Sequence, residues 1–372
     1  MTDIDEHLVI ACGGTGGHFY PTLAIAKEFQ KTGGRVTLMI SGAHADEQMA
    51  LAKENGIDAV RTEAERLSSK NPLKILKFGI NFLRNAWQAR RQLRDLDADL
   101  LLGMGSYASL PTCFFKPKWL PLFLHEGNAF MGKANRFLAI KATAIGLSLP
   151  LAFKTQVRHR PFEIVGMPLR ESLEEAAKSN QPDNDYLLSL GLKPNTPTLL
   201  IFGGSQGAQF INILMSKTAQ LFFGQRLQII HLTGTDDNSE LLNAYAEARI
   251  TASVRKAEPN IEKCYLAASL VICRGGASTL CELALFSKPA IIIPLPSAAD
   301  NHQAYNALLA EKVGGAIFMP QNEATPQSIA DKTKSLLNSP ARLAQMAQGI
   351  HTIAKPNAAQ NMVRLMLGAL GY

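Results

Sequence analysis

The sequence predicts an α/β protein made of two doubly wound, parallel-sheet domains. Short apolar runs alternate with amphipathic segments, as strands alternate with helices in such sheets. At 372 residues the chain is long for one hydrophobic core, so two domains are the natural expectation. Both halves open with an apolar run, a glycine-rich turn and a helix-like segment, which suggests a structural duplication.

The first half contains six short apolar runs that we expect to be strands, at 7–12, 35–40, 58–61, 100–102, 122–125 and 144–147. An amphipathic helix is expected over 21–31, because Pro21 suits the first turn of a helix. A second helix is expected from about Ala45. The segment 161–168 reads as the end of the first domain, and the polar stretch 178–185 as a loop.

The second half repeats the pattern, with strands expected at 199–202, 227–232, 270–273 and 290–294. Helices are expected from Ala208 and over 278–286, and the amphipathic segment 357–370 is expected to pack back on the first domain. The predicted organisation is an N-terminal domain, a C-terminal domain and a final helix, with the boundaries 1–166, 167–356 and 357–372.

Composition argues for a cytoplasmic protein. No run of about 18 apolar residues predicts a transmembrane helix, and the acidic start, Met1–Glu6, is unlike a signal peptide. The five cysteines form no Cys-x-x-Cys pair, which favours buried free thiols over a structural zinc site.

Positive charge is concentrated in the first half. Residues 1–166 carry 21 Lys and Arg against 15 Asp and Glu, and seven basic residues fall within 70–94. Such a concentration indicates an anionic partner. Here large apolar and basic residues mix at helical spacing, which fits either a core helix with a basic rim or a membrane-surface patch. The patch would consist of Lys74, Ile75, Phe78, Phe82 and Trp87. No nucleic acid is expected as a partner.

Three glycine-rich turns follow apolar runs, at 13–18, 103–107 and 203–208. Glycine lets backbone N–H groups approach a ligand, and a following helix N-terminus adds a positive dipole. Three such turns in two halves suggest sites for a diphosphate. For the first turn, the plain alternative is a tight turn with His18 capping a helix.

Two other patterns are weaker. The second turn matches G-x-G-x-x-A, with Glu126 near the expected acidic position, but it lies in the middle of its domain, which argues against a dinucleotide cofactor. Asp97-Ala98-Asp99 matches a metal-diphosphate pattern, but it precedes a strand, so these carboxylates are expected at the wrong edge of the sheet. No metal site is therefore predicted.

Two segments of the second half are polar where a strand ends. In 274–282, Ser278 or Thr279 could cap a helix with Glu282 in its first turn; alternatively, Glu282 could accept hydrogen bonds from a ribose diol. The amide-rich segment 300–306 suits a hydroxyl-rich ligand, although a plain polar loop fits equally well.

Together these motifs resemble those of the MurG family, bacterial cell-wall glycosyltransferases of the GT-B fold, in which two Rossmann-like domains face a cleft. The similarity covers residues 8 to about 310, with a family-like C-terminal helix. It is carried by the turn at 13–18 with Pro21, the turn at 203–208, Cys273-Arg274 with Glu282, and His302-Gln303 with Asn306. The family transfers N-acetylglucosamine from UDP to the C4 hydroxyl of the muramic acid on undecaprenyl diphosphate.

The resemblance implies roles for individual residues. His18 and Glu126 are the acid–base candidates, with His18 preferred as general base. Donor contacts are implied for Thr15, Gly16, Gly17, Asn128, Arg170, Ser205, Gln206, Glu282, Gln303 and Asn306. Contacts to the acceptor diphosphate are implied for Gly14, Gly16, Gly105, Ser106 and Tyr107.

The resemblance also implies partners and location. The partners are UDP-N-acetylglucosamine, the undecaprenyl-linked muramyl-pentapeptide, an anionic membrane surface and cell-wall synthesis proteins. No cofactor is implied, and the protein would lie on the cytoplasmic face of the plasma membrane. Alternatives are a soluble-acceptor glycosyltransferase or UDP-sugar epimerase of the same fold, or a non-catalytic UDP-sugar-binding scaffold.

The chain departs from the family pattern at four places. Gly127 replaces a glutamine, Ser106 replaces a glycine and Met167 replaces an asparagine. The fourth departure is the segment 257–261, which stands where the family has Phe-Ile-x-x-Met at its uracil pocket. Recognition of the base is therefore the least defined part of the expected donor site.

Overall fold

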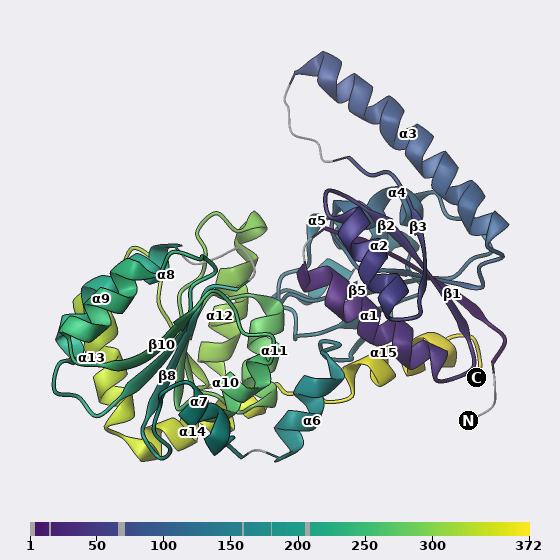
Figure 1. Ribbon diagram of the computed structural model, residues 1–372. Coiled ribbons are helices and arrows are strands. Elements are labelled where there is room, and N and C mark those ends of the chain that lie inside the picture. Colours follow the sequence, from purple (N-terminus) through teal and green to yellow (C-terminus); the bar gives the residue numbers. More distant parts are fainter. Residues whose placement is uncertain (1–3, 15, 66–70, 158–159, 180, 205–208) are drawn as a thin grey trace. The chain divides into compact units, whose positions relative to one another are not determined.

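The computed structural model describes residues 4–14, 16–65, 71–157, 160–179, 181–204 and 209–372 (Figure 1). The chain divides into two compact units. Unit 1 comprises Met1–Arg170 and Asn357–Tyr372, and unit 2 comprises Glu171–Pro356. The first unit thus ends after Arg170, where the sequence suggested an end after Gly166.

Unit 1 is built on a seven-stranded parallel sheet with the order β3-β2-β1-β4-β5-β6-β7. Its strands are β1 His7–Gly13, β2 Arg35–Ser41, β3 Asp58–Arg61, β4 Leu100–Gly103, β5 Leu122–Glu126, β6 Ala144–Leu147 and β7 Phe162–Ile164. Its α-helices are α1 Gly16–Gln30, α2 Ala45–Glu54, α3 Pro72–Asp95, α4 Leu110–Phe114, α5 Lys133–Leu138 and α15 Ala358–Gly368.

The central strands of unit 1 are apolar at successive positions because both faces of the sheet are covered. In β1, Leu8 and Ile10 belong to one buried cluster, with Phe19 of α1 and Met362 of α15. Val9 points to the opposite cluster. This alternation explains why an uninterrupted apolar run, rather than a polar–apolar repeat, marks each strand in the sequence.

Unit 2 is built on a six-stranded parallel sheet with the order β10-β9-β8-β11-β12-β13. Its strands are β8 Thr198–Phe202, β9 Gln228–Leu232, β10 Thr251–Arg255, β11 Leu270–Cys273, β12 Ala290–Ile292 and β13 Ala316–Phe318. Its α-helices are α6 Glu171–Ser179, α7 Asn184–Ser189, α8 Gln209–Thr218, α9 Ser239–Glu247, α10 Ile261–Ala267, α11 Ala277–Leu285, α12 His302–Lys312, α13 Pro326–Leu337 and α14 Pro340–His351.

The predicted fold class, two parallel-sheet α/β domains, is confirmed. Some expected boundaries were wrong. Helix α1 begins at Gly16, so Pro21 lies inside it, and the Thr22 hydroxyl donates to the His18 carbonyl (2.8 Å) in the same turn. The polar stretch expected as a loop includes the end of α6 and the start of α7.

The last helix, α15, returns to unit 1 after the whole of unit 2. Met362 is fully buried in the unit 1 core, and a Cβ on Gly146 would lie only 2.4 Å from its sulfur. Asn361 Nδ2 donates to the Val165 carbonyl (3.0 Å), and Arg364 pairs with Glu163 (3.1 Å). The expected packing of the final helix on the first domain therefore has direct contacts to support it.

Candidate active site

Each sheet has one point where the strand order changes direction. In unit 1 the chain runs outward from β1 to β3 and, on the other side, from β4 to β7. In unit 2 the same change falls between β8 and β11. Open α/β sheets bind ligands outside the carboxyl ends of their strands at such a switch point. The described parts of the three glycine-rich segments lie at these carboxyl ends: Gly14 follows β1, residues 104–107 follow β4, and residues 203–204 follow β8.

The turns after β1 and β4 lie against each other. Gly13 has a φ of +137°, and a Cβ there would stand 2.0 Å from the Ser41 carbonyl oxygen, so only glycine fits. A Cβ on Gly14 would stand 3.5 Å from Ser106 Oγ, and one on Gly42 would stand 3.2 Å from Tyr107 Oη. The backbones of both turns are therefore held close together at the switch point.

Ser106 occupies a backbone region that residues other than glycine rarely adopt, with φ 60° and ψ 171°. Its Oγ accepts a hydrogen bond from the Ala108 N–H (3.1 Å), which begins the short 3₁₀ helix Tyr107–Ser109. This is the position where the family pattern has glycine. Backbone strain of this kind concentrates at functional sites, which fits the location of the turn.

His18 is oriented by the second turn. It is the third residue of α1, and its Nδ1 lies 3.0 Å from the Met104 carbonyl oxygen. Because a carbonyl only accepts, Nδ1 carries the proton and Nε2 carries the lone pair. The Met104 N–H in turn donates to the Ala11 carbonyl (3.1 Å), so the partner of the imidazole is fixed to β1. The imidazole is therefore held in one orientation by a backbone carbonyl of the second turn.

The carboxylate of Glu126, at the end of β5, is 4% exposed and accepts four hydrogen bonds. Its Oε1 accepts from the backbone N–H (3.0 Å) and the side-chain Nδ2 (3.2 Å) of Asn128. Its Oε2 accepts from the Gly132 N–H (2.9 Å) and from Asn135 Nδ2 (3.0 Å). These contacts shape the loop 127–132, and they favour an organising role for Glu126 over proton transfer.

His125 precedes Glu126 but points into the core. Its Nε2 lies 3.0 Å from Ser148 Oγ and 3.4 Å from the Gly166 carbonyl. Burial, with a smaller contribution from the nearby His18, lowers the pKa of His125 to about 4, against the raising effect of the Gly166 carbonyl. His125 is therefore neutral at physiological pH and links β5 to the end of β7.

In unit 2, Arg274 holds three loops together from a position only 7% exposed. Its Nη1 donates to the carbonyls of Ile293 (3.1 Å) and Pro294 (3.2 Å) after β12, and to Gln321 Oε1 (2.9 Å) after β13. The guanidinium also lies over the Phe210 ring at 5.6 Å. Arg274 thus connects the segments that follow β11, β12 and β13 at the carboxyl edge of this sheet.

The turn after β11 packs tightly on the start of α12. A Cβ on Gly275 would lie 2.3 Å from the Gln303 carbonyl oxygen. Asn306 Nδ2 donates to the Gly275 carbonyl (2.9 Å), and Gln303 Oε1 accepts from the Leu295 N–H (2.9 Å). Asn306 is fully buried. The expected direct contact of Asn306 with the sugar is therefore disfavoured, and its amide instead holds the turn.

Glu282 is half-buried on α11, and its Oε2 accepts a hydrogen bond from the Tyr265 hydroxyl (2.7 Å). The N-cap of α11 is Gly276, without a side-chain cap, and Glu282 is the sixth residue of the helix. The alternative in which Ser278 or Thr279 caps the helix with Glu282 in its first turn was wrong. Glu282 instead forms a hydrogen bond with Tyr265 on α10.

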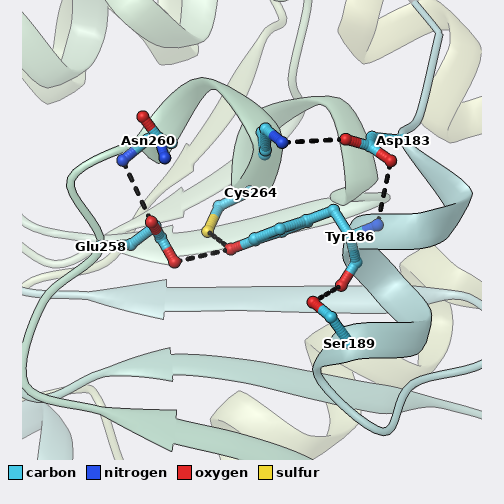
Figure 2. Close-up of polar contacts among 7 residues, drawn as sticks. Asp183, Tyr186, Ser189, Glu258, Asn260 and Cys264 are labelled. Atoms are coloured by element: carbon cyan, nitrogen blue, oxygen red, sulfur yellow. Dashed lines mark hydrogen bonds and ion pairs between the residues drawn. The ribbon is translucent and has the colours of Figure 1, made fainter.

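Glu258 organises the segment 257–261, where the chain departs from the family pattern (Figure 2). Its carboxylate accepts from the Tyr186 hydroxyl (3.0 Å), from Arg255 Nη1 (3.1 Å) and from the Asn260 N–H (3.1 Å). Tyr186 Oη also lies 3.1 Å from Cys264 Sγ. The loop between β10 and α10 is thus tied to α7 by polar contacts where the family has apolar residues.

Helix α3 presents two different faces. Phe78 stacks on Phe82 (6.2 Å), and Phe82 also contacts the rings of Phe114 and Phe115 (6.4 Å each). Phe78 and Phe82 are therefore half-buried members of the predicted patch, and the ring of Phe82 packs against the body of unit 1. The outer face carries a stripe in which each side chain is more than half exposed: Leu73, Leu76, Ile80, Leu83 and Trp87.

The predicted patch members Lys74, Ile75 and Trp87 are exposed. In Figure 1 the N-terminal half of α3 extends away from the rest of unit 1. Among the residues that the structure describes, none of the helices is both long and apolar enough to cross a bilayer.

The structure gives the following positions for the remaining residues that were predicted to contact ligands. Thr15, Ser205 and Gln206 lie outside the described residues. Gly16 and Gly17 open α1, where backbone N–H groups lack partners in the helix. Arg170 is the exposed last residue of the first segment of unit 1. None of the described residues forms a cluster of three or more candidate metal ligands.

The Asp-x-Asp pattern lies at the amino edge of the unit 1 sheet, as expected. Asp99 directly precedes β4, and its Oδ2 accepts from the His7 N–H (2.8 Å) at the start of β1. Asp97 adopts a positive φ of 52°. The pattern therefore connects two strands at the end opposite to the glycine turns.

Two residues that organise the site were missed from the sequence. Asn135 Nδ2 donates to the His125 carbonyl (2.9 Å) as well as to Glu126, and a Cβ on Gly105 would lie 3.2 Å from it. Tyr265 carries the hydroxyl that holds Glu282. Each sits within a short helix of mixed composition, α5 or α10, and nothing in the local sequence marks the side chain as part of the site.

Comparison with known families matches both halves of the chain. Residues 8–147 match the glycosyltransferase family 28 N-terminal domain, and residues 198–362 match the glycosyltransferase family 28 C-terminal domain.

Relatives match over nearly their full length. One from Protochlamydia amoebophila (strain UWE25) is 37% identical over 354 residues, covering 94% of this chain and 92% of that protein. One from Halothermothrix orenii (strain H 168) is 35% identical over 374 residues, covering 96% and 98%. Both are named UDP-N-acetylglucosamine--N-acetylmuramyl-(pentapeptide) pyrophosphoryl-undecaprenol N-acetylglucosamine transferase.

Solved structures agree on the fold. The crystal structure of Acinetobacter baumannii MurG superposes with a TM-score of 0.78 at 26% identity, covering 98% of this chain and 99% of that one. A UDP-GlcNAc 2-epimerase from Neisseria meningitidis, bound to UDP-GlcNAc, gives a TM-score of 0.65 at 12% identity, covering 98% and 99%. The second likeness concerns the fold alone.

Proposed function

Because this chain belongs to the MurG family within glycosyltransferase family 28, we infer that it is an N-acetylglucosaminyltransferase. It transfers N-acetylglucosamine from UDP-N-acetylglucosamine to the muramyl-pentapeptide carried on undecaprenyl diphosphate. The product is the disaccharide lipid precursor of peptidoglycan. The GT-B fold class expected from the sequence agrees with this assignment.

We propose that the orientation of His18 supports a direct displacement. The acceptor C4 hydroxyl attacks the anomeric carbon of the donor while its proton passes to Nε2 of His18. The bond between the anomeric carbon and the β-phosphate oxygen breaks, and UDP leaves. An α-linked donor then gives a β-1,4-linked product. The observation that carries this role is the 3.0 Å contact between His18 Nδ1 and the Met104 carbonyl, which fixes the tautomer of the base.

The backbone turns at the unit 1 switch point would receive the acceptor diphosphate. Gly14, Gly16, Gly105, Ser106 and Tyr107 contribute to this proposal, because they bring backbone N–H groups and hydroxyls to one edge. Glu126 supports the site indirectly by ordering Asn128 and the loop after β5. We assign it no proton transfer.

Unit 2 would receive the donor. Glu282 is proposed to accept the ribose hydroxyls and Gln303 to orient the sugar, with Ser205 and Gln206 meeting the uridine diphosphate. Thr15, Gly16, Gly17 and Asn128 are proposed donor contacts from unit 1. Arg170 and helix dipoles would stabilise the leaving diphosphate, and we propose no metal or other cofactor.

The outer stripe of α3, with Lys74 and Lys77, supports a peripheral membrane location. Exposed leucine, isoleucine and tryptophan side chains at helical spacing, flanked by lysines, suit an anionic bilayer surface. We propose that the protein works on the cytoplasmic face of the plasma membrane, where its lipid acceptor and cell-wall synthesis proteins are available.

The test is release of UDP from UDP-N-acetylglucosamine, with and without a short-chain lipid-linked muramyl-pentapeptide, each in the presence of EDTA. Release that requires the acceptor and survives EDTA supports the assignment. His18→Ala should lower kcat by about 10²–10⁴-fold, while replacement of the exposed His44 by alanine should not. Epimerisation of the donor without acceptor, or donor binding without turnover, would contradict the proposal.

A further inference from the structure

Tyr265 is a buried polar residue that the proposed reaction does not use. It lies on α10, is fully buried, and donates its hydroxyl hydrogen to Glu282 Oε2 on α11 across 2.7 Å. Among tyrosine contacts, a hydrogen bond to a carboxylate is one of the stronger kinds, because the acceptor is charged.

The ring of Tyr265 packs against two other aromatic rings. It stacks on Phe286 with 5.2 Å between centroids and 15° between planes. It also meets Phe202, the last residue of β8, edge to face at 6.0 Å and 85°. The ring is therefore packed between Phe202 at the end of β8 and Phe286 at the end of α11.

The hydroxyl of Tyr265 is always a donor under physiological conditions. Burial, and then the charge of Glu282, raises the pKa of the phenol well above its usual range. The phenol consequently stays protonated and donates a hydrogen bond to the carboxylate of Glu282. The bond from tyrosine occupies one of the roughly four acceptor positions of a carboxylate, and the two hydroxyls of a diol need two.

We propose that Tyr265 is a positioning residue that fixes the Glu282 carboxylate for a nucleotide ribose and so sets selectivity for ribose over 2′-deoxyribose. This inference rests on the proposed role of Glu282 in the donor site. A hydrogen bond that restricts the rotamers of the carboxylate favours binding of a diol, because that part of the conformational entropy is already lost before binding.

The experiment compares kcat and KM for UDP-N-acetylglucosamine and for its 2′-deoxyribose analogue in four proteins: wild type, Tyr265→Phe, Glu282→Gln and Tyr245→Phe. Tyr245 is the matched control, because it is also buried in unit 2 but its hydroxyl bonds His231 Nδ1 (2.9 Å). Wild type should prefer the ribose donor. Tyr265→Phe should raise KM for that donor about tenfold at unchanged kcat and lower the preference.

The outcomes distinguish the proposed ribose-binding role of Glu282 from the proposed positioning role of Tyr265. If Glu282→Gln keeps the ribose preference, both the proposed role of Glu282 and this inference are wrong. If Glu282→Gln removes the preference but Tyr265→Phe keeps it, only the inference is wrong. A fall in preference for Tyr245→Phe equal to that for Tyr265→Phe would also overturn it. p-Aminophenylalanine at position 265 keeps a donor in nearly the same volume, so it should restore the preference even if Tyr265→Phe folds poorly.

Discussion

Four donors surround the carboxylate of Glu126, and this contact set makes a sharp prediction at the level of one residue. In Glu126→Gln, one oxygen becomes an NH₂ group that faces two N–H donors, whichever way the amide turns. We expect a loss of about 1–3 kcal/mol in the free energy of unfolding, measured by urea denaturation. A general base would instead show lost activity at unchanged stability.

The control for that variant is Glu63→Gln, since Glu63 is exposed and pairs with a surface arginine, Arg61, at 3.5 Å. It should leave stability within about 0.5 kcal/mol of wild type. If Glu126→Gln were as stable as the control while turnover fell and the acid limb of the pH–rate profile disappeared, Glu126 would be the base after all.

Two buried histidines predict how stability depends on pH. Burial lowers the pKa of His125 to about 4 and that of His231 to about 3. Between these values and the unfolded value near 6.5, the unfolded chain binds protons that the folded chain refuses, so stability falls as pH falls below 6.5. At pH 5 each unit should lose about 2 kcal/mol relative to pH 7.5.

Urea unfolding at pH 7.5 and pH 5 checks this expectation. Replacing the exposed His44 by glutamine should leave the difference between the two pH values unchanged. Stability that is equal at both pH values would show that the two imidazoles are protonated in the folded protein.

Sequence analysis identifies residues that belong to a local pattern. It misses residues whose contacts are with partners far away along the chain. His18 could be predicted because it ends a glycine-rich turn that precedes a helix. Asn135 and Tyr265 could not, because their partners Glu126 and Glu282 are 9 and 17 positions away along the chain. Asn306 was assigned to the ligand because the sequence cannot tell an amide that meets a sugar from one that holds a turn.

At the level of elements, α3 carries a stripe of exposed apolar side chains on its outer face. Its inner face packs through Phe82, Ala86, Ala89 and Leu93, while its outer face exposes apolar side chains at positions 73, 76, 80, 83 and 87. The sequence located the helix and its basic residues correctly. It could not say which aromatic side chains face outward, because both faces of this helix are apolar.

The double substitution Leu76→Asp and Ile80→Asp should weaken binding to anionic vesicles at least about tenfold, because it removes two insertable side chains and adds two negative charges. Co-sedimentation with phosphatidylglycerol-containing liposomes measures this. Folding should be preserved, since both side chains are about 60% exposed. Leu242→Asp, on an exposed face of unit 2, is the control. Unchanged vesicle binding would remove α3 from the membrane contact.

Strand prediction succeeded where apolar runs were continuous and failed where strands were short or exposed. β1, β4 and β8 are buried along their whole length and were recognised from composition. β10 was missed because it is an edge strand of mixed composition, in which Ser253 is buried and the apolar residues Ala252 and Val254 are only partly buried. β13 has three residues, too few for a periodic signal.

At the level of the whole chain, unit 1 is completed by a helix that follows all of unit 2. Two-domain organisation could be predicted from length and from the repeated strand–turn–helix opening. The return of α15 was an expectation from its amphipathic pattern, and its contacts with β6 and α1 come from tertiary packing alone. A substitution near residue 360 should therefore act on a core formed mainly by residues before 170.

Met362→Ala tests that dependence and should destabilise unit 1 by about 2–5 kcal/mol, since Met362 is fully buried against Gly146. Pulsed thiol labelling in urea, read by mass spectrometry, reports each unit separately. Cys12 and Cys113 are buried in unit 1, and Cys264 and Cys273 in unit 2. Met362→Ala should expose the first pair at lower urea and leave the second pair unchanged. Met346→Ala, in the unit 2 core, should do the reverse. If both pairs became reactive together in both variants, the two units would unfold as one cooperative body, and the stability of the donor site would depend on the packing of α15.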